Sequence, residues 1–151
     1  MPALAMAKLP TRAPTHEDVP PGRLASIGLE IEDIADDGEV GLRALIELAE
    51  DRGRPVSHYL AAIPLATELR LAGDAPLTVK VCAGVCQRWG ALDLLDHLAE
   101  RASGFAIAPV SCLDHCDQAP ACEIHGPHGR LVIAPATRQA VDEALRELAG
   151  E

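Results

Sequence analysis

The chain has 151 residues, of which 48% are hydrophobic and only 2% aromatic, so one domain-sized core must be built from aliphatic side chains. Its net charge of −10, without any cluster of basic residues, argues against a nucleic acid or an anionic membrane as partner and fits a basic partner. No apolar run is long enough to span a membrane and no signal-peptide core is recognisable, so we expect a cytoplasmic protein without membrane insertion.

The first part of the chain is predicted to be an arm. Residues 1–35 are expected to be flexible or bound to a partner, since the first 22 residues contain five prolines and no apolar periodicity. The apolar residues of 23–34 mix a period of two with helical spacing, and they decide neither for a strand nor for a helix.

Residues 36–75 are predicted to form a small helical region. A first helix is expected to begin at Asp36 or Asp37, which are good N-cap residues, and to run to about Arg52 before a glycine. A second helix is expected to open at Pro55, and Pro64 should interrupt or restart it. A short helical pattern continues to residue 69. The side chains of the second helix that should face the core are Tyr59, Leu60 and Ile63.

Residues 76–151 are predicted to form an α/β domain. Its expected elements are a strand at 77–82, a helix at 87–103, a strand at 105–110, two short strands at 121–124 and 130–133 joined by a turn at 125–129, and a helix at 136–149. The strand–helix–strand unit makes the first two strands parallel, and the hairpin adds an antiparallel edge. This order predicts a thioredoxin-like α/β sandwich, preceded by the helical region.

Four cysteines in two matched pairs are the strongest chemical signal. Cys82 and Cys86 enclose three residues at the end of the first strand, and Cys112 and Cys116 enclose three residues after the second. Neighbouring parallel strands end at the same edge of a sheet, so both loops can converge on one site. In a reducing compartment such pairs indicate metal or redox chemistry more often than disulfides.

Thiolates are soft, charged donors that bind iron and zinc. The interpretation we favour is a [2Fe–2S] cluster, with Cys82 and Cys86 on one iron and Cys112 and Cys116 on the other. A structural zinc site and a dithiol redox centre are the alternatives, although both more commonly enclose two residues within a pair. No catalytic constellation and no glycine-rich nucleotide loop is recognisable, so we expect an electron-transfer subunit and not a catalyst on its own.

Other residues near the cysteines are assigned minor roles. Cys122 is expected to be a small core residue near the cluster and not a ligand, and His115 a solvent-facing loop residue. Trp89 is expected in the core. The residues predicted to form a solvated helix face are Asp93, Asp96 and Glu100.

The family resemblance is carried by two segments, VCAGVCQRWGALDLLDHL and VSCLDHCDQAPACEIHG. Together they resemble the thioredoxin-like [2Fe–2S] ferredoxins, which include the peripheral iron–sulfur subunit of complex I, the gamma subunit of NAD-linked formate dehydrogenases, subunits of NAD-linked hydrogenases and free-standing ferredoxins. The likeness covers roughly residues 53–150. Its clearest positions in the second half are Cys112, Cys116, Ala119, Pro120 and Gly126.

This resemblance implies one-electron transfer through a [2Fe–2S] cluster, within an NADH-linked oxidoreductase whose partner subunit carries a flavin or an iron–sulfur centre. A free-standing ferredoxin and a zinc-stabilised four-cysteine interaction module are the alternatives. Two features depart from the complex I type. The first cysteine pair there usually encloses four residues, against three here, and residues 63–69 lack the aromatic side chains of the matching segment. The fold and the cluster therefore carry over more safely than the parent complex.

Overall fold

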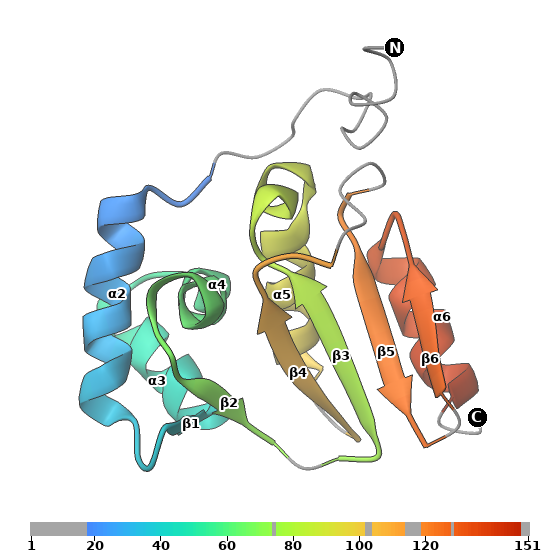
Figure 1. Ribbon diagram of the computed structural model, residues 1–151, viewed down its shortest axis with the longest axis horizontal. Helices are drawn as coiled ribbons and strands as arrows, with labels where there is room; N and C mark the ends of the chain where they lie inside the picture. The colour runs from blue at the N-terminus through green and yellow to red at the C-terminus, as the bar shows by residue number, and fades with distance from the viewer. Residues whose placement is uncertain (1–17, 74, 102–103, 114–118, 128, 149–151) are drawn as a thin grey trace.

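A computed structural model describes residues 18–73, 75–101, 104–113, 119–127 and 129–148 of the chain. They form a mixed α/β structure with a helical part beside a four-stranded sheet (Figure 1). In chain order the elements are α2 (Pro21–Ile34), β1 (Glu39–Gly41), α3 (Leu42–Arg52), α4 (Val56–Ala66), β2 (Arg70–Ala72), β3 (Leu77–Cys82), the 3-10 helix η1 (Val85–Trp89), α5 (Ala91–Glu100), β4 (Phe105–Val110), β5 (Cys122–Gly126), β6 (Gly129–Ile133) and α6 (Arg138–Leu148).

The main sheet has the strand order β4-β3-β5-β6. Strands β3 and β4 are parallel and in register from Leu77 opposite Phe105 to Cys82 opposite Val110. Strand β5 runs antiparallel to β3 and forms a hairpin with β6. The α/β class, the parallel pair and the antiparallel hairpin are confirmed, and β3 and β4 have the predicted bounds.

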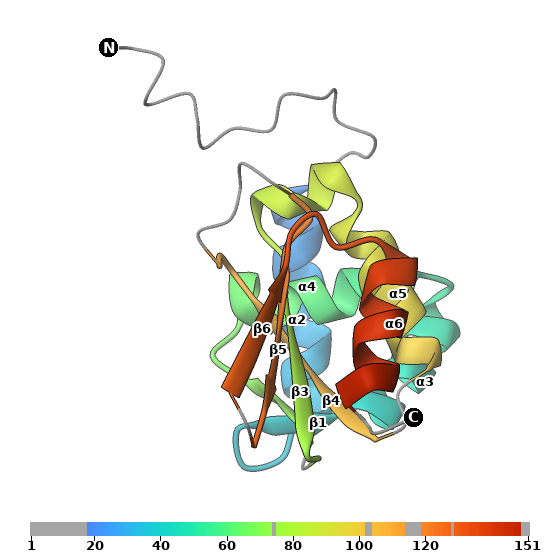
Figure 2. The ribbon, with the colours of Figure 1, turned by 90° about the vertical axis from the view of Figure 1, so that its right-hand side faces the viewer.

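Helices α5 and α6 lie on the same side of the main sheet (Figure 2). The core side chains of β3 alternate with half-buried ones, as expected for a strand with one face against helices. The predicted inward residues of α5 (Leu94, Leu95 and Leu98) are buried, and so is Val141 of α6. Burial of each such side chain contributes about 1.5–3 kcal/mol to the stability of the fold. This packing holds the helices on the sheet and so positions the strand ends that carry the cysteine loops.

Helix α4 connects the helical part to the sheet. It contacts α2, α3, α5 and β4, and Figure 1 shows it between α2 and the β4 edge. Its predicted core residues are all buried: Tyr59, Leu60 and Ile63. The Asp96 carboxylate of α5 accepts hydrogen bonds from the Ser57 backbone N–H (2.8 Å) and hydroxyl (2.9 Å) at the start of α4. Asp96 is therefore half-buried and bonded, and its predicted place on a solvated face is wrong.

The predicted arm over residues 1–35 is wrong for Pro21–Ile34, which form α2. Ile27 and Ile31, one helical turn apart, are fully buried. A Cβ at Gly28 would lie 3.1 Å from the Ala66 carbonyl oxygen, so the glycine permits the close crossing of α2 and α4. Residues 1–17 of the expected arm lie outside the described residues.

The predicted start of the first helix, at Asp36 or Asp37, is also wrong. Asp37 and Gly38 adopt positive φ (53° and 77°) in a turn that leads into β1, and the helix begins only at Leu42. Its predicted end is confirmed, because Gly53 caps it at a φ of 68°.

Two further helix boundaries differ from the prediction. Helix α4 continues through Pro64 to Ala66, and the residues expected to prolong a helical pattern lead instead into β2, which pairs parallel with β1. The helix expected at 87–103 is divided into η1 and α5 at Gly90, whose φ of 106° interrupts regular helix. Among the described residues, no helix combines the length and the apolar character needed to cross a membrane.

Candidate metal centre

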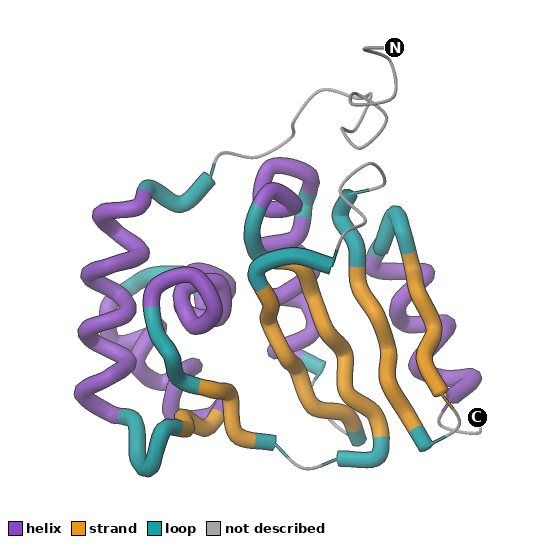
Figure 3. Tube along the Cα trace, in the orientation of Figure 1, coloured by secondary structure: helices purple, strands orange, loops and turns teal. Residues whose placement is uncertain are grey.

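The two cysteine loops begin at the same end of the sheet, as the parallel strands require. Cys82 is the last residue of β3 and lies opposite Val110, the last residue of β4. The Ala83 N–H donates to the Val110 carbonyl oxygen (2.7 Å), so the first loop stays against β4 as it leaves the sheet. Figure 3 shows the loop after β4 arching over this end of the strands.

Cys82 and Cys86 form a buried pair. The 3-10 turn of η1 returns the chain so that the two sulfurs share a hydrogen bond. This bond is the largest of the effects that together lower the pKa of the Cys82 thiol to about 6, while burial acts in the opposite direction. Backbone N–H groups of Gly84, Cys86 and Leu113 are also directed at the sulfur and contribute to this lowering of its pKa. The site thus stabilises a thiolate, which is the form that binds metal.

The second loop reaches the sulfur of the first. The Cys82 thiol donates to the Ser111 carbonyl oxygen (3.7 Å), and the Leu113 N–H is directed at the same sulfur. Gly84 faces the same Ser111 carbonyl so closely that a Cβ there would overlap it. The backbones of the two loops therefore meet beside the Cys82 sulfur, at a position where only a glycine fits.

The predicted ligands are brought together only in part. Cys82 and Cys86 meet, whereas Cys112 is exposed. Cys116 and His115 lie outside the described residues, so the predictions for them stay predictions. Within the residues that the structure describes, no three side chains of the His, Cys, Asp or Glu type come together as a metal site.

Gln87, which the sequence analysis did not single out, holds the first loop. Its amide nitrogen donates to the Ala83 carbonyl oxygen (2.7 Å), and its amide oxygen accepts from the Val19 N–H (2.8 Å). The side chain is buried, and the adjacent Arg88 pairs with Asp18 at 3.1 Å. The segment before α2 is thus attached to the cysteine loop, a contact that no local pattern could reveal.

The minor predictions fare unequally. Cys122 is fully buried, as expected of a core residue, and burial together with the Glu123 carboxylate raises the pKa of its thiol to about 12. Trp89 is buried as predicted. His125 was expected in the hairpin turn but belongs to β5, where its Nε2 lies 2.9 Å from a carboxylate oxygen of Glu123.

The sequence matches none of the protein-family models and none of the curated proteins with which it was compared. The chemistry of the site therefore rests on its own residues. A buried thiolate that accepts several backbone N–H groups provides the environment of an iron–sulfur ligand, because such hydrogen bonds to sulfur are what tune these clusters. Among the described residues, Cys82 and Cys86 are the pair whose thiols could hold such a metal group together.

Proposed function

We propose that the chain is a one-electron carrier that binds a [2Fe–2S] cluster through Cys82, Cys86, Cys112 and Cys116. The observation that carries this proposal is the approach of the second cysteine loop to the first thiolate: the Leu113 N–H donates to Cys82, and Ser111 packs against Gly84. Donors from both cysteine loops on one sulfur are what a site shared by the two pairs requires.

The chain's own residues have two tasks in this proposal. When bound, the cluster supplies a site that takes up and returns one electron. The N–H groups at Cys82 favour negative charge on the sulfur, which stabilises the more reduced state. Cys112, in contrast, is exposed and offers a short route between the site and a partner at the surface.

We further propose that the domain is thioredoxin-like and serves an NADH-linked oxidoreductase, with a flavin- or iron–sulfur-bearing subunit as electron partner. The strand order, with a parallel pair at one side and a hairpin at the other, supports this fold. The oxidoreductase rests on the resemblance around the four cysteines alone.

The decisive experiment is anaerobic reconstitution of the full chain, followed by metal and sulfide analysis and an absorption spectrum. We expect about two iron and two sulfide per chain and the visible absorption of an iron–sulfur protein. Changing Cys82, Cys86, Cys112 or Cys116 singly to Ser should remove or strongly alter this spectrum, because each change replaces a thiolate ligand.

Cys122→Ser provides the matched control, since it changes a buried cysteine of the same sheet that is not among the proposed ligands. It should retain the iron, the sulfide and the spectrum. One zinc per chain without sulfide would instead show the zinc-stabilised module, and a spectrum unchanged in all four ligand variants would refute the cluster.

A further inference from the structure

Two hollows adjoin on the surface between α2 and the end of α4. One is about 700 Å³ and the other about 410 Å³, and both are lined by Glu32, Leu65 and Ala66. The first continues to Glu68 and Leu69, the second to Leu24 and Leu29. Because they share one wall, they form a single groove along α2, which we call the α2–α4 groove.

The groove exposes apolar side chains. Leu29 is 69% exposed and Leu65 38%, whereas the neighbouring Ile27 and Ile31 are fully buried. Leu29 is the most exposed large hydrophobic residue in the described part of the chain. Two exposed leucines that line one groove beside polar residues are a feature of protein-interaction surfaces.

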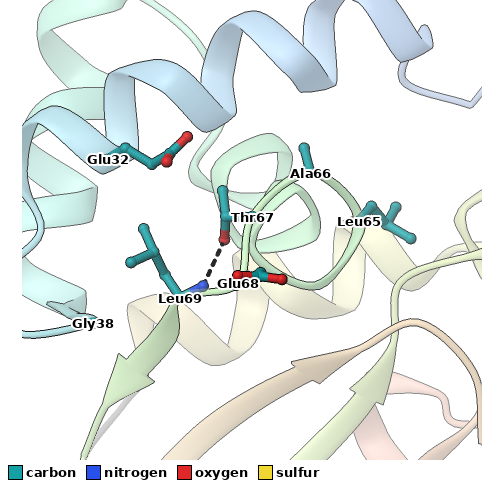
Figure 4. A pocket seen from close by; sticks show the side chains of 7 residues that line it. All are labelled: Glu32, Gly38, Leu65, Ala66, Thr67, Glu68 and Leu69. Carbon is teal, nitrogen blue, oxygen red and sulfur yellow. Dashed lines mark hydrogen bonds between the residues drawn. The ribbon is translucent and has the colours of Figure 1, made fainter.

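The floor of the groove is built in advance of any partner. Gly28 packs closely against Ala66 and Thr67, since a Cβ there would lie 3.1 Å from the Ala66 carbonyl oxygen and 3.2 Å from the Thr67 methyl group. The Thr67 hydroxyl donates to the Ile63 carbonyl oxygen (2.8 Å) and accepts from the Leu69 N–H (3.1 Å), which fixes the turn after α4 (Figure 4). A preformed groove requires little ordering when a partner binds.

Two carboxylates line the groove, those of Glu32 and Glu68, and the chain around Glu32 is acidic. Residues 30–39 contain six carboxylates and no lysine or arginine. Glu30 and Glu39 pair with arginines, at 3.0 Å to Arg54 and 3.3 Å to Arg70. The carboxylates that make no ion pair within the described ranges are Glu32, Asp33, Asp36 and Asp37. Figure 4 shows Glu32 and Glu68 on either side of Thr67.

We propose that the α2–α4 groove binds an amphipathic helical segment of a partner protein, with its apolar residues on Leu29 and Leu65 and its lysines or arginines facing Glu32 and Glu68. The groove's shape suits a helix that inserts one apolar face. Its charge attracts a basic segment and repels nucleic acid and anionic lipid. This inference rests on the surface alone and is independent of the cluster.

The test uses the full-length protein and a fluorescently labelled synthetic helical peptide with leucines on one face and lysines and arginines beside them. Binding should weaken at least about tenfold in Leu29→Asp, which places a charge in the apolar contact. Leu131→Asp, at an exposed leucine of β6 outside the groove (42% exposed), is the control and should bind as the native protein does.

Charge is tested separately. The double variant Glu32→Gln/Glu68→Gln should weaken binding and reduce its dependence on salt. Glu47→Gln/Glu50→Gln removes the same charge from exposed positions of α3 outside the groove and should change binding little. A peptide with glutamates in place of its basic residues should not bind.

Three results would overturn the proposal. The first is equal peptide affinity of Leu29→Asp and Leu131→Asp, and the second is equal affinity for the basic and the acidic peptide. The third is a concentration-dependent dimer in sedimentation that Leu29→Asp abolishes, because a second copy of the chain would then occupy the groove. Circular dichroism should show both leucine variants folded, since neither leucine is in the core.

Discussion

At Cys82 the fold changes the acidity of a single sulfur atom. The hydrogen bond from Cys86 and the N–H groups of two loops favour the thiolate, so the pKa falls to about 6 although the residue is buried. Forty residues along the chain, Cys122 has the opposite character: burial and Glu123 raise the pKa of its thiol to about 12. Two buried cysteines on adjacent strands thus differ in thiol acidity, which suits Cys82 to the metal ligation we propose and Cys122 to packing in the core.

This difference predicts a specific pH dependence of stability in the metal-free protein. The folded-state pKa of Cys82 lies below that of an unfolded thiol, about 8.5. Its contribution to the free energy of unfolding should therefore be complete above about pH 8.5 and lost as the pH falls through about 6. Urea unfolding between these pH values, with the ultraviolet absorbance of the thiolate followed in parallel, measures both effects.

Two variants complete that experiment. Cys82→Ser should remove this part of the pH dependence. Cys122→Ala should retain it, because a raised pKa contributes stability below the unfolded value and loses it only as the pH rises toward about 12. If Cys82→Ser and the native protein showed the same slope of stability with pH, the thiolate at Cys82 would be disproved.

Gly84 provides a second prediction at the level of one residue. Gly84→Ala places a Cβ against the Ser111 carbonyl oxygen and must push the two cysteine loops apart. We expect a loss of about 1–3 kcal/mol in unfolding free energy, typical of overpacking, together with a lower iron content after reconstitution. Gly22→Ala is the control, since nothing lies within 4 Å of a Cβ there; an iron content as low in Gly22→Ala would contradict the steric explanation.

The sequence predicts some of these residues and not others, for a physical reason. The cysteine pairs are visible because their spacing is local. Gln87 and Asp96 are not, because their partners Val19 and Ser57 are 68 and 39 positions away along the chain. The local sequence around a single amide or carboxylate side chain is the same whether that side chain faces solvent or bonds to a distant segment of the chain.

At the level of elements, the apolar pattern predicts an element reliably where one of its faces is buried and the element is long enough for the pattern to repeat. Strands β3 and β4, with six residues each, were predicted to their ends. The three-residue strands β1 and β2 were missed, because so short a segment shows no periodicity. The sequence pattern of α2 is ambiguous because the exposed Leu29 adds a period of two to the helical spacing of Ile27 and Ile31.

The role of α2 as part of the core can be measured directly. Ile31→Ala should cost about 2–5 kcal/mol in unfolding free energy, since it leaves a cavity at a fully buried position. Leu29→Ala, two residues earlier on the exposed face, should change the stability by less than about 0.5 kcal/mol. Chemical denaturation of both variants provides the comparison, and equal small effects would mean that α2 is not docked in solution.

For the whole molecule, α4 decides whether the helical part and the sheet behave as one unit. It contacts α2 on one side and α5 and β4 on the other. The hydrogen bonds from Ser57 to the Asp96 carboxylate connect its first turn to α5. The segment before α2 also reaches the first cysteine loop through Gln87. Because core residues of both parts belong to one buried cluster, disturbance of the helices should be transmitted to the cysteine end of the sheet.

One cooperative unit predicts one unfolding transition. The chain contains a single Trp, and Trp89 lies in η1 beside the cysteine loop, so its fluorescence reports on the sheet end alone. Far-ultraviolet circular dichroism reports on all helices, including α2, α3 and α4. In urea, the two signals of the metal-free protein should coincide in midpoint and slope, as two-state unfolding requires.

Asp96→Asn weakens the bonds to Ser57 and should shift both unfolding curves together to lower urea concentration. Helical signal lost before the Trp89 signal would instead show that the helical part opens on its own, and that α4 does not couple it to the cysteine site.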